Sequence, residues 1–145
     1  MAANTAPIYT LVPHVSWGAT DGDGGAAGPL KTANTARDGT GTVLTLFTGT
    51  TNGSFVKNIG LVAVGTNTAS VVRVFVNNGS TNATLANNIQ IAEKTLPATT
   101  LSAVAETAAV EIILNLPIPN GYKIFVTLGT TVAAGYNVYA SGGDY

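Results

Sequence analysis

The fold is decided by residues 70–79, SVVRVFVNNG, in which apolar and polar positions alternate. Every second residue from Val72 to Val76 is a valine, and Arg73 falls between them on the other side. A period of two residues is that of a β-strand, whose successive side chains point to opposite faces of the sheet. The stretch ends in Asn78-Gly79, a pair that accepts the positive φ angles of tight turns. It therefore predicts a strand that is buried on one face and ends in a turn.

The same alternation recurs along the chain and predicts the fold class. It is present, or begins, in residues 42–48, 55–64, 89–91, 110–116, 122–128 and 136–140. Two further Asn-Gly pairs, at Asn52-Gly53 and Asn120-Gly121, lie beside these stretches. Residues 103–109 are the one helical candidate, and the β-branched residues in and around them oppose a helix. About seven or eight short strands predict an all-β chain, a single antiparallel β-sandwich of jelly-roll type.

Alternation also predicts which side chains face the core. In residues 42–48 it places Leu46 and Phe47 on opposite faces of the strand. In residues 55–64 it places Phe55 and Ile59 on the same, buried face.

The first forty-one residues differ in composition and periodicity from the rest of the chain. Residues 1–15 contain two prolines and little periodicity, and residues 21–29, DGDGGAAGP, have the composition of a flexible loop. Residues 31–41 are polar without an apolar stripe. We therefore expect residues 1–41 to form an extended N-terminal arm with one strand around residues 15–17. Residues 42–145 would then form the β-sandwich domain.

The chain has few charged residues, which indicates the kinds of partner that it can bind. Only 9% of the 145 residues are charged, against about 25% in an ordinary soluble domain. Because surface charge keeps molecules apart, such a surface is suited to being covered by copies of itself or by a larger assembly. The six basic residues are matched by seven acidic ones and form no run, which argues against a nucleic-acid partner.

The chain contains no cysteine, so its fold does not depend on an oxidising compartment. The N-terminal residues lack the basic and apolar regions of a secretory signal. No apolar stretch approaches the roughly 20 residues that a membrane-spanning helix needs. We therefore expect synthesis in the cytoplasm and no membrane partner.

Candidate catalytic and metal-binding residues are few. His14 is the only histidine, and nothing near a serine resembles the G-x-S-x-G turn that exposes a nucleophile. With one histidine and no cysteine, a metal would depend on oxygen ligands. The run Asp21-Gly22-Asp23-Gly24 resembles the start of a calcium loop but lacks a closing glutamate. We expect no enzymatic activity and no cofactor, and leave open an ion at Asp21 and Asp23.

Carbohydrate binding is the alternative that aromatic residues support, because exposed aromatic rings can hold the faces of sugars. The candidates are Tyr9, Trp17, Tyr122, Tyr136, Tyr139 and Tyr145. Tyr136 and Tyr139 fall on opposite faces of one predicted strand, so at most one of them can share a platform with Tyr122.

Three stretches, taken in order, resemble a known group of proteins. They are residues 32–41, TANTARDGTG; residues 60–65 running into 71–79, GLVAVG and VVRVFVNNG; and residues 93–97, EKTLP. Together they resemble small virion structural proteins of tailed bacteriophages, a loose group of β-sandwich decoration (cement) and head- or tail-associated proteins. The resemblance spans most of residues 30–145, and its motifs are strand and turn strings rather than a catalytic signature.

The resemblance implies a structural role in a virus particle. It implies a capsid decoration protein on the virion surface, a homotrimer that binds across the boundaries of the major capsid protein and stabilises the head. From expected exposure in the arm and its lead-in, the candidate interface residues are Tyr9, His14, Trp17, Lys31, Asn34, Arg37 and Asp38. A tail- or fibre-associated host-contact protein and a carbohydrate-binding module remain the alternatives.

Overall fold

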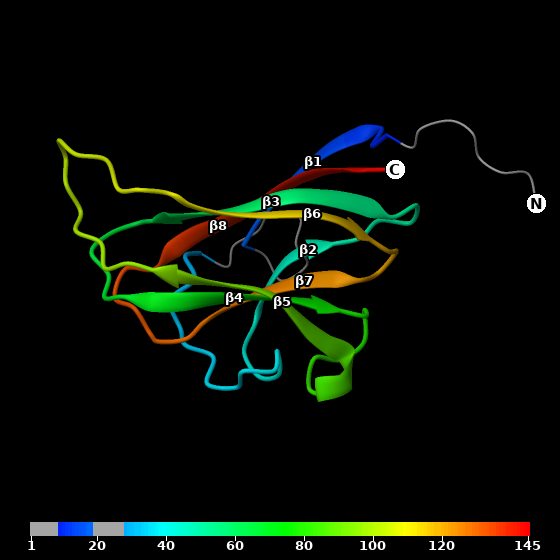
Figure 1. Ribbon diagram of the computed structural model, residues 1–145, viewed down its shortest axis with the longest axis horizontal. Helices are drawn as coiled ribbons and strands as arrows, with labels where there is room; N and C mark the ends of the chain where they lie inside the picture. Colours follow the sequence, from blue (N-terminus) through cyan, green and yellow to red (C-terminus); the bar gives the residue numbers. More distant parts are fainter. Residues whose placement is uncertain (1–8, 19–27) are drawn as a thin grey trace, which may run out of the picture.

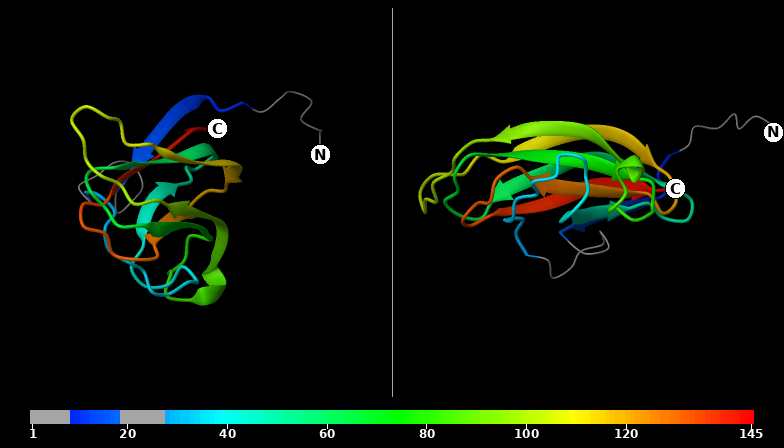
Figure 2. Two further views of the ribbon diagram at one scale, coloured as in Figure 1. Left: turned by 60° about the vertical axis from the view of Figure 1, so that its left-hand side comes forward. Right: turned by 90° about the horizontal axis from the view of Figure 1, so that it is seen from below.

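Two four-stranded antiparallel sheets pack face to face in the computed structural model, which describes residues 9–18 and 28–145 (Figures 1 and 2). Sheet A has the strand order β1-β8-β3-β6, and sheet B has the order β2-β7-β4-β5. The strands are β1 (Val12–Trp17), β2 (Leu44–Thr48), β3 (Ser54–Ala63), β4 (Ser70–Asn77), β5 (Asn88–Leu96), β6 (Val110–Ile118), β7 (Lys123–Leu128) and β8 (Tyr136–Asp144). The single helical element of the described chain is the 3-10 turn η1 (Leu85–Asn87). The all-β sandwich expected from the alternation is confirmed.

Strand pairing is nested from the middle of the chain outward. Strand β4 pairs with β5, β3 with β6, β2 with β7 and β1 with β8, all antiparallel. Consecutive strands lie in different sheets except for β4 and β5, which form a hairpin within sheet B. The chain therefore crosses from one sheet to the other at nearly every connection.

The Asn-Gly pairs mark turns, but two of the three lie at crossings between the sheets. Asn52-Gly53 lies between β2 and β3, and Asn120-Gly121 lies between β6 and β7. Only Asn78-Gly79 lies inside the β4–β5 hairpin. In all three pairs the glycine has a positive φ, between 75° and 89°, whereas the asparagine does not.

The core lies between the sheets, and the valine alternation of β4 is confirmed there. Val72 and Val74 are fully buried, with Val76 packed against the same cluster. The predictions for two other strands are wrong because each contains a register shift. Leu46 and Phe47 are both fully buried, since the β2–β7 register shifts between Thr45 and Phe47. An inserted residue of this kind turns the following side chains to the other face.

Strand β3 contains the second register shift, between Val56 and Asn58. Before the shift, Val56 is fully buried and Phe55 is only half-buried, the reverse of the prediction. After the shift, Ile59 faces the core as expected.

The described residues of the predicted arm are part of the sandwich. The strand expected around residues 15–17 is present as β1, and it forms an edge of sheet A. Residues 28–43 run from sheet A to sheet B: Leu30 bridges Tyr136 of β8, and the Asn34 amide donates to the Leu128 carbonyl oxygen of β7 at 2.8 Å. Gly39 then lies against Phe75 on the outer face of sheet B (Figure 1). Phe75 and Phe125, which are paired across β4 and β7, are buried on that outer side. No separate unit ends at residue 41 in this part of the chain.

Gly142 provides a test of how closely β8 approaches β3. A Cβ atom at this position would lie 1.9 Å from the carbonyl oxygen of Phe55, so the two backbones would have to separate. We expect Gly142→Ala to lower the free energy of unfolding by about 1–3 kcal/mol, as overpacking does. Urea denaturation measures this. Asn137→Ala, at an exposed position of the same strand, should stay within about 0.5 kcal/mol of the unmodified protein. Equal stability of the two variants would contradict the close approach.

Candidate assembly surface

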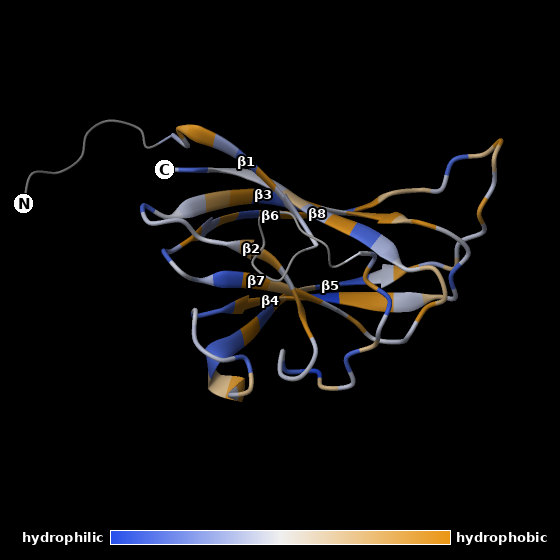
Figure 3. Ribbon diagram, turned by 180° about the vertical axis from the view of Figure 1, so that it is seen from behind, coloured by the Kyte–Doolittle hydropathy of each residue, from blue (hydrophilic) through white to orange (hydrophobic). Residues whose placement is uncertain are grey.

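The exposed large hydrophobic side chains of the described residues fall into two groups. One group lies on β1, β3, β8 and their flanks and comprises Tyr9, Leu11, Val12, Val15, Trp17, Val62, Val64 and Tyr139. The other lies on β5, β6 and the segments beside them and comprises Leu85, Ile89, Ile91, Leu101, Val104 and Ile113. We call the second group the β5–β6 edge. Figure 3 shows hydrophobic colour both on β1 and at the tip of the β5–β6 connection.

The β5–β6 edge is one of the two sides of the sandwich that terminal strands form; β1 and β2 form the other. Strand β5 is the last strand of sheet B, and β6 is the last strand of sheet A. They lie next to each other across the two sheets, where Lys94 Nζ donates to the Glu111 carbonyl oxygen at 2.7 Å. Such terminal strands have one backbone edge without a partner strand and are therefore places where another chain can add.

Aliphatic side chains are unusually accessible along this edge. Ile113 on β6 is 69% exposed and Ile89 on β5 is 64% exposed. Val104, in the connection between these strands, is 97% exposed. Exposed aliphatic side chains on two neighbouring terminal strands are a candidate site of protein association. Sequence reasoning missed this edge, because alternation predicts which way a side chain points but not whether its strand is central or terminal.

Four of the seven predicted interface residues are exposed. Tyr9 and Trp17 are 73% and 55% exposed, and Lys31 and Arg37 are also accessible. They are distributed over two regions: Tyr9 and Trp17 flank or belong to β1, whereas Lys31 and Arg37 lie in the segment between β1 and β2.

Asn34 and Asp38 instead stabilise the segment that covers sheet B. Asn34 is only 4% exposed, and its Nδ2 donates to the carbonyl oxygens of Thr40 and Thr42 at 2.8 and 2.6 Å. The carboxylate of Asp38 accepts hydrogen bonds from the hydroxyl and the amide of Thr40. These bonds from Thr40 lower the pKa of Asp38. Both side chains therefore have structural partners within the chain.

His14 belongs to a hydrogen-bonded cluster that joins three strands of sheet A. Its Nδ1 lies 3.0 Å from both carboxylate oxygens of Asp144, and Ser54 Oγ donates to Asp144 Oδ1 at 2.6 Å. The His14 ring also lies against Phe47, with ring centroids 4.4 Å apart. The shared carboxylate thus connects β1, β8 and β3. Burial raises the pKa of Asp144, but hydrogen bonds from Ser54 and His14 outweigh it and leave the pKa below the ordinary value.

Residues 9–18 and 28–145 contain no cluster of three or more histidine, cysteine or acidic side chains that could hold a metal ion. Asp21 and Asp23, the candidate ion-binding pair, lie outside the described residues. In the same part of the chain, no helix has the length and apolar character to cross a membrane.

The fold and these surfaces define a class of protein: an all-β sandwich with two exposed hydrophobic surfaces and a nearly uncharged exterior. Comparison with known proteins finds no matching family model, no matching curated protein and no matching solved structure.

The Asp144 cluster predicts a specific response to acid. Because the pKa of Asp144 is lower in the folded protein than its ordinary value of 3.8, its ionised form stabilises the fold. This contribution is complete above the unfolded pKa and is lost as the pH falls through the folded pKa. Asp144→Asn should therefore lower the free energy of unfolding at pH 7 by about 1–3 kcal/mol, and should reduce its loss on acidification.

Urea denaturation at a series of pH values measures both effects. Glu106→Gln, in the exposed β5–β6 connection, is the matched control and should leave the profile unchanged. An Asp144→Asn profile that follows that of the unmodified protein would show that the cluster does not stabilise the fold.

Proposed function

We propose that this protein is a structural component of a bacteriophage particle, a capsid decoration protein that stabilises the head by binding across boundaries of the major capsid protein. It acts as a homotrimer on the virion surface and catalyses no reaction. The resemblance of three stretches of the chain to small virion structural proteins supports this role. The β-sandwich fold is compatible with it.

We further infer that the sandwich is a jelly roll. The four strand pairs are nested, so that the chain follows the path of one long antiparallel hairpin wrapped around the core. Eight strands in two sheets connected in this way are characteristic of jelly rolls, an architecture that recurs in viral capsid domains. This architecture is shared by proteins of many functions, so it supports the fold type and not the role itself.

The observation that carries the proposal is the set of exposed aliphatic side chains on the β5–β6 edge. Aliphatic side chains such as Ile89 and Ile113 gain about 25 cal/mol for each Å² removed from water. Four exposed charged residues lie on this edge, Glu93 and Lys94 on β5, Glu111 on β6 and Glu106 in the connection, and Lys94 already has a partner in the Glu111 carbonyl oxygen. A specific interface buries about 800 Å² on each partner, roughly a tenth of the 7828 Å² surface of this chain. Copies of the same chain are the occupants that we assign to this edge.

The self-association predicts that a charge on the edge separates the subunits. Ile113→Lys places an ammonium group where the proposal requires a desolvated side chain, so the trimer should dissociate to monomers. Sedimentation velocity at a fixed protein concentration measures the oligomeric state. Val62→Lys, an exposed position on β3 outside the edge, should leave the trimer intact. An unchanged trimer in Ile113→Lys would exclude this edge as the subunit interface.

The capsid role is tested directly with heads of the corresponding phage that lack the protein. We expect saturable co-sedimentation at a fixed ratio to the major capsid protein, together with greater resistance of the heads to heat. The protein with residues 1–8 deleted keeps every described residue and separates the contribution of the N-terminus from that of the sandwich. Binding to tails and not to heads would replace the decoration role with a tail-associated one.

A further inference from the structure

An aromatic pair lies on the outer face of sheet A, on the opposite side of the sheet from the core. Trp17 on β1 is paired with Tyr139 on β8, and Tyr139 is paired in turn with Gly60 on β3. Trp17 is 55% exposed and Tyr139 is 38% exposed. The two rings therefore belong to one row that runs across the strands, where directly opposed side chains have their Cβ atoms about 5 Å apart.

The Tyr139 ring and the Trp17 backbone are held in place by the sheet. A Cβ atom on Gly60 would lie 2.2 Å from Cζ of Tyr139, so the phenol ring occupies the space that a side chain at this position would take. The antiparallel pairing of β1 with β8 continues one residue beyond Trp17, because the Gly18 amide donates to the Val138 carbonyl oxygen at 3.2 Å. A ligand that packs on the Tyr139 ring therefore orders this side chain little on binding, which lowers the entropic cost.

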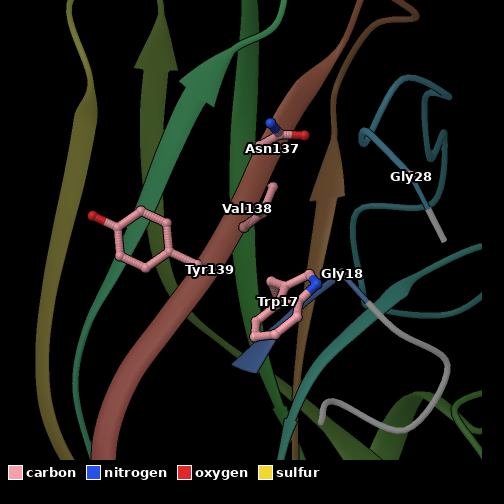
Figure 4. A pocket seen from close by; sticks show the side chains of 6 residues that line it. All are labelled: Trp17, Gly18, Gly28, Asn137, Val138 and Tyr139. Carbon is pink, nitrogen blue, oxygen red and sulfur yellow. The ribbon is translucent and has the colours of Figure 1, made fainter. Parts of the chain in front are cut away.

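The pair borders a cavity of about 400 Å³, within the range of roughly 300–1,000 Å³ found for small-ligand pockets. Its described lining comprises Trp17, Gly18, Gly28, Asn137, Val138 and Tyr139. Figure 4 shows the Asn137 side chain on the same strand as Tyr139, two residues along and therefore on the same face. The amide of Asn137 supplies two donors and an acceptor on this face of the sheet. Figure 4 shows the Tyr139 ring on the opposite side of β8 from Trp17, so the two rings flank the strand and do not face each other.

The chemistry of this lining selects the ligand class. None of its described residues carries a formal charge, and a neutral ligand needs no counter-charge from them. Aromatic rings pack against the apolar C–H face of a sugar, while an amide satisfies its ring of hydroxyl groups. We propose that Trp17, Asn137 and Tyr139 form a binding site for a sugar ring of a neutral glycan. The site is independent of the β5–β6 edge and of the decoration role.

Trp17 is the only tryptophan of the chain, so its fluorescence reports on this site alone. The full-length protein, at constant concentration, is titrated with linear cello-, malto- and chito-oligosaccharides. At least one series should produce a saturable blue shift of the emission. Tyr139→Ala should weaken that binding by about tenfold or more. Tyr9→Ala, which removes an exposed aromatic ring outside the cavity lining, should leave it unchanged.

Gly60→Ala tests whether the position of the Tyr139 ring matters for binding, because it displaces the ring without removing it. The added methyl group forces the Tyr139 ring to move and removes no group that would contact the sugar, so affinity should fall while urea stability stays close to normal. The proposal is overturned if none of the three series changes the emission, or if the change persists in Tyr139→Ala. It is also overturned if the emission responds only to protein concentration, which would make this surface a contact between copies of the chain.

Discussion

Strand β8 is the element on which sheet A depends, because it lies between β1 and β3 and forms hydrogen bonds with both. Its last residues are Gly142, Gly143 and Asp144, and each allows or makes a close contact with a neighbouring strand. The glycines let the backbones approach, and the carboxylate binds side chains from the two adjacent strands. The end of the chain thus stabilises the strand that begins the described structure.

The two groups of exposed hydrophobic side chains differ in chemistry. The β5–β6 edge is aliphatic and belongs to the terminal strands of the two sheets. The other group includes aromatic rings with an amide beside them, on one face of sheet A. Aliphatic surface is best covered by similar surface, whereas aromatic and amide groups suit a ligand that is both apolar and hydroxylated. One small domain therefore presents two surfaces of different chemistry.

Alternation in the sequence was sufficient to predict the fold class and most strands, since β4 follows its valine pattern in the core. It failed at Phe47 and Phe55, because a register shift changes the buried face and leaves no mark in composition. It also missed the burial of Phe75, which is covered by a polar segment far away in the chain. For the candidate surfaces, the exposure of Trp17 was predicted, but the β5–β6 edge as a whole was not, because alternation does not show which strands end a sheet.

Nested pairing also constrains the order in which this chain can fold during synthesis. The β4–β5 hairpin joins neighbouring parts of the chain, whereas His14 and Asp144 are 130 residues apart. Contacts between distant residues form slowly because a long loop must close before they stabilise anything. Sheet A cannot be completed until the ribosome has released the last strand, since β8 lies in its interior. Until then, β1 and β3 have no strand between them, and their hydrophobic side chains remain open to premature association.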